Sequence, residues 1–234
     1  MTGKSGSGKS GGGARGSGRS TGGRVRVRTA RSRTASSTRW LERHLNDPYV
    51  KRAQSDGYRA RAAYKLLELD EKFDLLRDAR RIVDLGAAPG SWSQVVLKRY
   101  PKASIVGIDL LPVDPLAGLT FIQGDFLTDE SAAAVAEALG GKADLVMSDM
   151  AANTVGHHGT DHIRTMALVE AAAHFAMEHL APGGAFIAKV LAGGAEQQLV
   201  GALKRSFSSV RHAKPPASRK ESSETYVVAT GFKG

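Results

Sequence analysis

The stretch Val83–Gln94, VDLGAAPGSWSQ, decides the fold class of this 234-residue chain. A β-branched run at Arg81–Leu85 leads into Gly86 and Gly90, and a helical pattern follows near Ser93–Lys98. Glycines at these positions let the main chain approach a ligand closely. The spacing is not GxGxxG and the loop has no lysine, so it fits neither the dinucleotide fingerprint nor a P-loop. The stretch predicts a strand–loop–helix unit that places a ligand against the glycine loop.

Short β-branched runs and helical patterns alternate on both sides of this unit. An apolar stripe with spacings of four, three and four residues predicts a helix within Arg59–Phe73. Further strands are expected at Ser104–Ile108, Thr120–Gln123, Leu145–Ser148, Ala185–Leu191 and Tyr226–Thr230, and further helices near Glu130–Leu139, Ile163–Leu180 and Ala195–Phe207. This alternation predicts an α/β fold with a doubly wound, mostly parallel sheet and helices on both faces.

An aspartate stands at the end of each of three successive strands after the glycine loop. Asp109 closes IVGID, Asp125 follows FIQG, and Asp149 follows LVMS. Ligands of such sheets bind at the carboxyl ends of the strands, where Asp109 suits a ribose diol. Asp125 could accept a hydrogen bond from an adenine amino group, and Asp149 is placed at the centre of the crevice. A single aspartate commonly begins a turn or caps a helix, but this series predicts an adenosyl-cofactor site.

Six motifs together resemble one enzyme family. They are VDLGAAPGSWSQ, GIDLLPVDPLAG, QGDF, VMSDMAAN, LAPGGAFIAKVL and SSETYVVATGF. The set resembles the FtsJ-like ribosomal RNA 2′-O-methyltransferases of bacteria, and the resemblance runs from about Trp40 to Lys233. It implies the Rossmann-like fold of class I S-adenosylmethionine-dependent methyltransferases, with a seven-stranded, mostly parallel sheet and an antiparallel last strand.

The resemblance also implies the residues of the site. Contacts to S-adenosylmethionine would come from Gly90, Trp92, Asp109, Asp125 and Asp149, beside the close approach expected at Gly86. The implied catalytic tetrad is Lys65, Asp149, Lys189 and Glu224. The implied substrate is a uridine ribose in the A-loop of 23S rRNA, methylated on the assembled large (50S) subunit. Ser91, Ala152 and the glycine-rich VLAGGAEQQ depart from the family pattern, which leaves the target nucleotide less defined than the chemistry.

The chemistry explains why such a tetrad is needed. A ribose hydroxyl is a poor nucleophile, so the enzyme must align it with the donor methyl and remove its proton during attack. Lys189, inside the apolar run FIAKVL, needs a partner or a purpose. It could be the base only when neutral, and the sequence leaves its protonation state open. By themselves, Lys65 would be a solvated helix lysine and Glu224 a surface residue.

The net charge of +10 lies at the N-terminus. Residues 1–39 hold ten Lys or Arg and no acid, so the remaining 23 basic residues equal the 23 acidic ones. We expect a disordered Gly/Ser/Arg-rich arm at 1–39 that contacts RNA, followed by the methyltransferase domain at 40–234. A transit peptide is the alternative. GKSGSGKS at Gly3–Ser10 matches a P-loop pattern, but no strand precedes it and no helix pattern follows it.

Two clusters leave alternatives open. His157, His158 and His162, beside Asp161, could bind a metal. We expect a substrate-facing loop there and no metal. Trp40, Tyr49 and Tyr58 stand among basic residues, which suits RNA stacking as well as packing on the domain.

The composition bounds the function classes. The chain has no cysteine, which excludes disulfides and a cysteine nucleophile and fits a cytoplasmic protein. No apolar run approaches the roughly 20 residues of a membrane span, so we expect no membrane partner. We also expect no DNA partner, and a monomer. The alternatives are a cap-type messenger RNA 2′-O-methyltransferase and a non-catalytic, RNA-binding ribosome-assembly factor.

Overall fold

The computed structural model describes residues 34–152, 158–191 and 197–234. The chain forms two compact units, Met1–Asn46 and Asp47–Gly234. In the first unit, helix α1 (Ala35–Leu45) begins after Thr34, whose side chain accepts a hydrogen bond from the Ser37 main-chain N–H at 3.2 Å. The boundary predicted at residue 39 falls inside this helix. Residues 1–33, with the P-loop-like stretch, lie outside the described residues.

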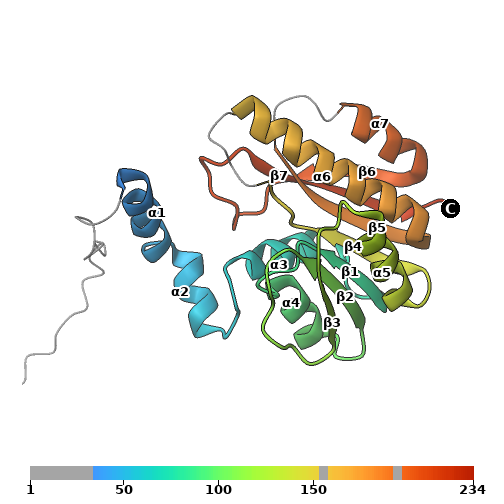
Figure 1. The fold of residues 1–234 in the computed structure, drawn as a ribbon, viewed down its shortest axis with the longest axis horizontal. Helices are drawn as coiled ribbons and strands as arrows, with labels where there is room; N and C mark the ends of the chain where they lie inside the picture. Colours follow the sequence, from blue (N-terminus) through green and yellow to red (C-terminus); the bar gives the residue numbers. More distant parts are fainter. Residues whose placement is uncertain (1–33, 153–157, 192–196) are drawn as a thin grey trace, which may run out of the picture. The chain divides into compact units, whose positions relative to one another are not determined.

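The second unit is built on one seven-stranded sheet, shown in Figure 1. Its strands are β1 (Arg81–Leu85), β2 (Ser104–Asp109), β3 (Leu119–Gln123), β4 (Ala143–Ser148), β5 (Leu180–Leu191), β6 (Phe207–Ala213) and β7 (Glu224–Phe232). The order is β3-β2-β1-β4-β5-β7-β6. β1 to β5 pair in parallel, and β7 lies antiparallel between β5 and β6. The strand order reverses between β1 and β4, where such sheets bind their ligands.

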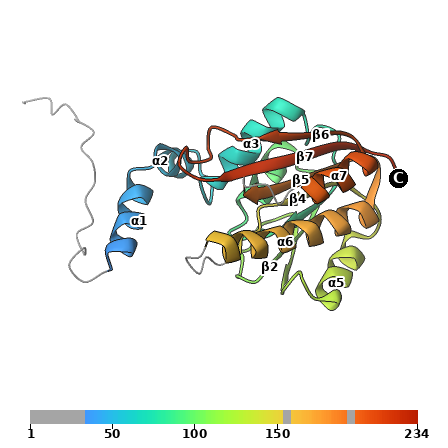
Figure 2. The ribbon, with the colours of Figure 1, turned by 90° about the horizontal axis from the view of Figure 1, so that it is seen from above.

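Helices cover both faces of the sheet, as Figures 1 and 2 show. One face carries α5 (Asp129–Leu139), α6 (His158–His179) and α7 (Gln197–Ser206), and the other carries α3 (Ala62–Phe73) and α4 (Ser91–Arg99). Strand β1 shows how the sequence serves both layers. Val83 and Leu85 pack toward the first set of helices, whereas Ile82 packs toward the second, because successive strand residues point to opposite faces.

The predicted fold class is confirmed, including the antiparallel last strand. One prediction was wrong: Phe207 was assigned to the end of a helix, but Phe207–Ala213 forms β6. β6 is an edge strand with buried residues at its two ends alone, so it lacks a clear alternation of apolar and polar residues.

Two helices were not predicted. They are α1 and α2 (Pro48–Ser55). The start of α2 carries a readable signal, since Asp47 caps it by accepting the Tyr49 N–H at 3.0 Å and Pro48 occupies its first turn. No helix among the described residues is long and apolar enough to cross a membrane.

Candidate active site

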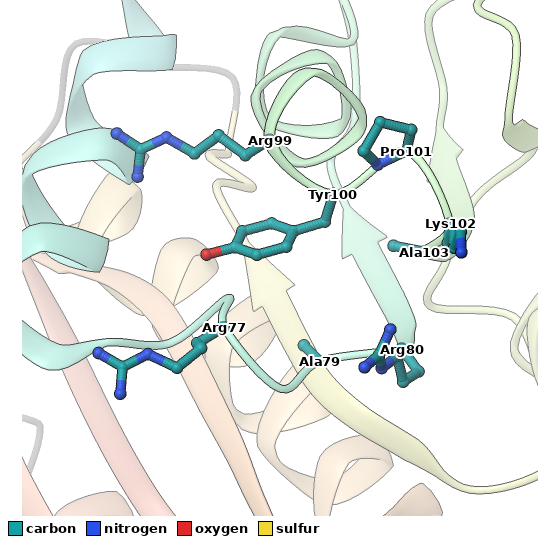
Figure 3. Close-up of a pocket in the computed structure, with 8 residues that line it drawn as sticks. All are labelled: Arg77, Ala79, Arg80, Arg99, Tyr100, Pro101, Lys102 and Ala103. Atoms are coloured by element: carbon teal, nitrogen blue, oxygen red, sulfur yellow. The ribbon is translucent and has the colours of Figure 1, made fainter.

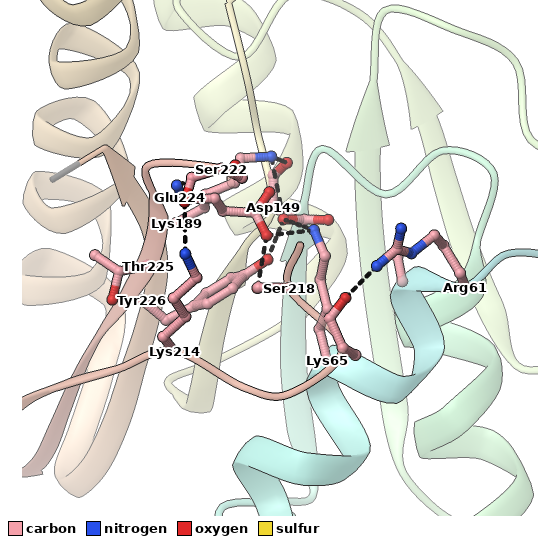
Figure 4. A network of polar contacts seen from close by, with 12 residues as sticks. Arg61, Lys65, Asp149, Lys189, Lys214, Ser218, Ser222, Glu224, Thr225 and Tyr226 are labelled. Carbon is pink, nitrogen blue, oxygen red and sulfur yellow. Dashed lines mark hydrogen bonds and ion pairs between the residues drawn. The ribbon is translucent and has the colours of Figure 1, made fainter. Parts of the chain in front are cut away.

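Four charged side chains from four elements meet at the carboxyl edge of the sheet, as Figure 4 shows. Lys65 comes from α3, Asp149 directly follows β4, Lys189 lies on β5, and Glu224 begins β7. Lys189 Nζ lies 3.1 Å from Asp149 Oδ1. Lys65 Nζ lies 2.8 Å from Glu224 Oε1 and 3.8 Å from Asp149 Oδ1. The predicted tetrad residues therefore form one cluster in which cations and carboxylates alternate.

Strand register brings three of these residues together. In the parallel β4–β5 pair, Ser148 lies opposite Ala188, so the next residues along, Asp149 and Lys189, are neighbours. In the antiparallel β5–β7 pair, Lys189 lies opposite Tyr226 and Leu191 opposite Glu224. The cluster depends on β7 lying antiparallel beside β5, because this pairing brings the start of β7 to the end of β5.

Tyr226 is a fifth member of the cluster that the sequence analysis missed. Its hydroxyl donates to Asp149 Oδ1 at 2.7 Å, and its ring is fully buried, 5.8 Å from that of Trp92. Burial, followed by the negative charges of Asp149 and Glu224, raises the pKa of Tyr226 well above its ordinary value. The readable signal is its position two residues after Glu224 on the same strand, since buried tyrosines usually find a hydrogen-bond partner.

Asp149 is kept ionised by its neighbours. Burial by itself would raise the pKa of this carboxyl, but the charges of Lys189 and Lys65 and the Tyr226 hydroxyl outweigh burial and lower it below its ordinary value. Lys189 Nζ also donates to the Asp149 main-chain carbonyl at 2.6 Å. Lys189 is 8% exposed, so its ammonium group is nearly enclosed by the protein.

The loop after β1 requires glycine at Gly86 and Gly90. Gly86 has a φ of +78°, and a Cβ there would lie 2.8 Å from Met150 Cγ. Gly90 has a φ of +90°. Asp109 joins this loop to the end of β2, because its Oδ2 accepts the Ala88 N–H and its Oδ1 accepts the Leu111 N–H, each at 2.9 Å. The loop and the end of β2 thus form one fixed surface with a carboxylate in it.

Arg59 stabilises this surface through three hydrogen bonds from its guanidinium. Its guanidinium donates to the main-chain carbonyl of Pro89 at 3.0 Å, in the glycine loop. It also donates to the carbonyls of Asp114 and Pro115, each at 2.8 Å, in the segment after β2. One planar group therefore joins the two segments that border the predicted cofactor site. The sequence gives no sign of this role, because the acceptors are main-chain carbonyls, which every residue has.

The family of the chain follows from its match to a known model. The model described as FtsJ-like methyltransferase matches residues 58–232. The chain belongs to the FtsJ-like methyltransferase family. Its predicted family, enzyme class and methyl donor, S-adenosylmethionine, are thereby confirmed.

Bacterial relatives and a solved structure agree with this assignment. Proteins named ribosomal RNA large subunit methyltransferase E from Erythrobacter litoralis and Rhizorhabdus wittichii are 67% and 65% identical over 199 residues. These matches span 85% of this chain and 90% and 87% of the relatives. A crystal structure described as a Plasmodium falciparum ribosomal RNA methyltransferase aligns with a TM-score of 0.68 and 34% identity, over 76% of this chain and all of that one.

Two other residues that are predicted to contact the cofactor in this FtsJ-like methyltransferase, Asp125 and Trp92, differ in their exposure. Asp125 is exposed after β3, and its Oδ1 accepts the Leu127 N–H at 3.0 Å within a turn. The Trp92 indole is 2% exposed, and its Nε1–H donates to the Ala62 carbonyl at 2.8 Å. That side chain is committed to packing against α3, so any contact of Trp92 with the cofactor would use its main chain.

Asp84, within the glycine-loop motif, is a buried acid that the sequence analysis did not single out. Its Oδ2 accepts the Ser93 hydroxyl at 2.7 Å and the Ser93 N–H at 3.2 Å, while its Oδ1 has no partner among the described residues. Burial raises the pKa of Asp84 to about 7, and the nearby charges of Asp149 and Asp109 add to this shift, against the Ser93 hydrogen bonds.

The segment before β7 is fastened to α3 and holds Glu224 in place. The Ser218 hydroxyl donates to Glu224 Oε1 at 2.9 Å, and the next residue back, Ala217, donates its N–H to Glu68 Oε2 at 2.7 Å. Arg61 donates to the Ala217 carbonyl and to the buried Asp47 carboxylate. Arg61 and Glu68 on the α3 side thus fix the turn that carries Glu224 to Lys65.

The sequence leaves the role of three aromatic residues open between RNA stacking and packing on the domain. Tyr49 and Tyr58 pack against Tyr64 at ring distances of 5.4 and 5.7 Å, and the Tyr49 hydroxyl donates to Glu68, so packing is the reading that the structure favours for both. The side chain of Trp40 lies outside the described part.

The histidine cluster is described in part. His157 and the side chains of His158 and Asp161 lie outside the description, and His162 Nε2 is buried with no hydrogen-bond partner among the described residues. Within the described ranges, no group of three His, Asp or Glu side chains could hold a metal.

Proposed function

We propose that this enzyme transfers a methyl group from S-adenosylmethionine to the ribose 2′-hydroxyl of a uridine in the A-loop of 23S rRNA, within the large ribosomal subunit. The observation that carries the proposal is the alternating cluster Lys189–Asp149–Lys65–Glu224 at the edge of the crevice. The names of the bacterial relatives support a large-subunit RNA substrate.

The residues around the crevice fit the cofactor. Gly86 and Gly90, at φ of +78° and +90°, would turn the loop so that its main chain can face the cofactor, and Asp109 would accept hydrogen bonds from the ribose hydroxyls. Asp125 would accept from the adenine amino group, and Asp149 borders the transfer site. When bound, the cofactor supplies a reactive methyl on a sulfonium.

Lys189 is the base in this proposal. Its two short contacts run to the carbonyl and to Oδ1 of Asp149, at 2.6 and 3.1 Å. A neutral amine has two N–H groups and one lone pair, so these contacts would use both hydrogens and leave the lone pair for the hydroxyl proton. The geometry would thus aim the acceptor at the substrate. Asp149 remains an anion, which would stabilise the ammonium that forms as the proton moves to Lys189.

Lys65 and Glu224 position the reacting groups. Lys65 lies between the two carboxylates, so its single positive charge offsets part of their negative charge in the partly buried cluster. Glu224 has its second contact in Ser218, whose hydroxyl donates to the same oxygen, Oε1, that pairs with Lys65. We assign the acid-free N-terminal stretch as an arm that binds RNA phosphates, since its ten cations suit a polyanion.

Methyl transfer to defined RNAs tests the proposal. Labelled S-adenosylmethionine is offered to the enzyme with isolated large subunits, free 23S rRNA and capped RNA in parallel, and the labelled nucleotide is mapped. We expect label on one uridine ribose of the large subunit, and none with Lys189→Ala as the matched inactive control. Label on capped RNA alone would identify the cap-type alternative, and binding without transfer would identify an assembly factor.

A further inference from the structure

A second cluster of polar side chains lies at the edge of the sheet opposite the tetrad. There a pocket of about 270 Å³ opens where β1 and β2 begin, and Figure 3 shows the residues that line it. The tetrad lies where β4 ends, and β4 runs parallel to β1. The five residues of β1, at about 3.3 Å each, therefore separate the two edges by roughly 17 Å.

The pocket concentrates positive charge in a part of the chain that is otherwise acidic. Residues 82–200 carry six basic and thirteen acidic residues, and three of those six basic residues fall within KRYPK at 98–102. The neighbouring segment RDARR at 77–81 adds three arginines. Arg77, Arg80, Arg99 and Lys102 line the pocket together, and all four are exposed.

Two of these cations have acidic partners and two do not. Arg77 pairs with Asp74 at 2.8 Å and Arg99 with Asp70 at 2.7 Å. Each ion pair orients a guanidinium but leaves other N–H groups to donate. Arg80 and Lys102 form no ion pair with any other described residue, so an external anion would give them their counter-charge.

Tyr100 lies between the cations. Its hydroxyl points toward the same side of the pocket as the guanidinium groups of Arg77 and Arg99, whereas Arg80 and Lys102 lie toward the other side (Figure 3). Guanidinium, ammonium and tyrosine hydroxyl groups are the side-chain donors that phosphate oxygens accept from most often. Donors on both sides of an aromatic ring suit a chain of phosphates better than one compact anion, since the ring face can also meet a ribose or base.

We propose that this pocket is a second RNA site, which binds the phosphodiester backbone of the substrate RNA at the opposite edge of the sheet from the methylated ribose. The proposal rests on the proposed function, because it takes the substrate to be an RNA that extends from the methylated ribose to the opposite edge of the sheet. Its contribution is affinity and orientation, with no part in the chemistry, because the pocket lies roughly 17 Å from the tetrad by the strand length given above.

Paired charge removals test the site. The variant Arg80→Ala/Lys102→Ala removes the two unpaired cations, and Lys204→Ala/Arg205→Ala removes two exposed cations from α7 as a matched control. Both keep the full N-terminal stretch. Affinity for isolated large subunits is measured across a KCl series, with cofactor affinity and the single-turnover rate at saturating subunits alongside.

The expected result is specific to the pocket. Arg80→Ala/Lys102→Ala should weaken subunit binding about tenfold at low salt and flatten the dependence of log K on log salt by about two, one for each lost phosphate contact. The control pair, the cofactor affinity and the saturated rate should not change. Equal weakening in both pairs, or wild-type binding in the pocket pair, would overturn the proposal. The proposed function fails separately, if the wild-type enzyme binds subunits but transfers no methyl.

Discussion

Asp84 lies on β1 and Asp149 directly follows the neighbouring strand β4, and the surroundings of the two carboxylates give them opposite properties. Asp84 has Ser93 as its hydrogen-bonding residue and no cation, and burial raises its pKa to about 7. For Asp149, burial acts in the same direction, but Lys189, Lys65 and Tyr226 outweigh it and lower the pKa. Burial without a paired cation therefore raises a carboxyl pKa, whereas burial beside paired lysines keeps the carboxylate ionised.

The largest effect should come from removing the lysine that distinguishes the two sites. Lys189→Ala should slow methyl transfer by about 10²–10⁴-fold, because a positioned proton acceptor is lost. Lys189→Arg should fail as well, since arginine keeps its charge and accepts no proton. Single-turnover transfer to large subunits measures the rate, and calorimetry should show nearly unchanged cofactor affinity.

A folding control is needed for this variant. Without Lys189, Asp149 keeps Lys65 at 3.8 Å and Tyr226 at 2.7 Å, so thermal unfolding should show a weakened but intact fold. Transfer within about tenfold of wild type by a folded Lys189→Ala enzyme would mean that Lys189 is not the base.

The second largest effect is on stability and tests the raised pKa of Asp84. The pKa of Asp84 is raised in the folded protein, so its stabilising contribution is complete below the ordinary carboxyl pKa of about 4 and is lost as pH rises through about 7. Asp84→Asn removes this titration. Relative to the variant, wild type should lose about 3 kcal/mol of unfolding free energy between pH 5 and pH 8.

Urea unfolding at the two pH values measures this difference. Asp78→Asn, at an exposed acid, is the matched control and should follow wild type. An Asp84→Asn protein whose stability changes with pH as wild type does would show that Asp84 is ionised throughout. Asp149 should show the opposite pH dependence: its contribution to the unfolding free energy is present above the ordinary carboxyl pKa and is lost as pH falls.

Asp109 extends the comparison to a carboxylate that main-chain N–H groups hold. Asp109→Ala should weaken binding of S-adenosylmethionine by about 2 kcal/mol, the scale of hydrogen bonds to a charged group. Asp114→Ala removes an exposed acid from the same segment and should bind normally. Calorimetry giving equal affinities for the two variants would remove Asp109 from the cofactor site.

Much of this site was accessible from the sequence because strand ends carry it. The three aspartates after β2, β3 and β4 follow short β-branched runs, and the parallel arrangement puts their positions at one edge. Lys65 and Glu224 came from resemblance alone, since nothing local distinguishes either of them from a surface residue. The structure brings those two side chains within 2.8 Å of each other.

The remaining features depend on contacts that leave no local pattern. The role of Arg59 lies in three main-chain carbonyls, which every residue has. β6 is an edge strand with little alternation, so its β character comes from pairing with β7. Tyr226 reaches Asp149 because β7 pairs with β5 across the chain, and a sequence pattern does not specify that register.

Tyr226 provides the smallest test of the comparison, because its hydroxyl gives Asp149 a neutral hydrogen-bond donor, as Ser93 gives Asp84. Tyr226→Phe keeps the buried ring and removes the 2.7 Å hydrogen bond, at a cost of about 1 kcal/mol and hence roughly fivefold in rate. The hydroxyl helps to lower the pKa of Asp149, so its loss should move the acid limb of the pH–rate profile to higher pH. Tyr58→Phe is the control, since the Tyr58 hydroxyl forms no hydrogen bond with any described residue, and it should leave the profile unchanged. A merely structural role for Tyr226 would lower the rate equally at every pH, so an unshifted acid limb would separate Tyr226 from the electrostatics of Asp149.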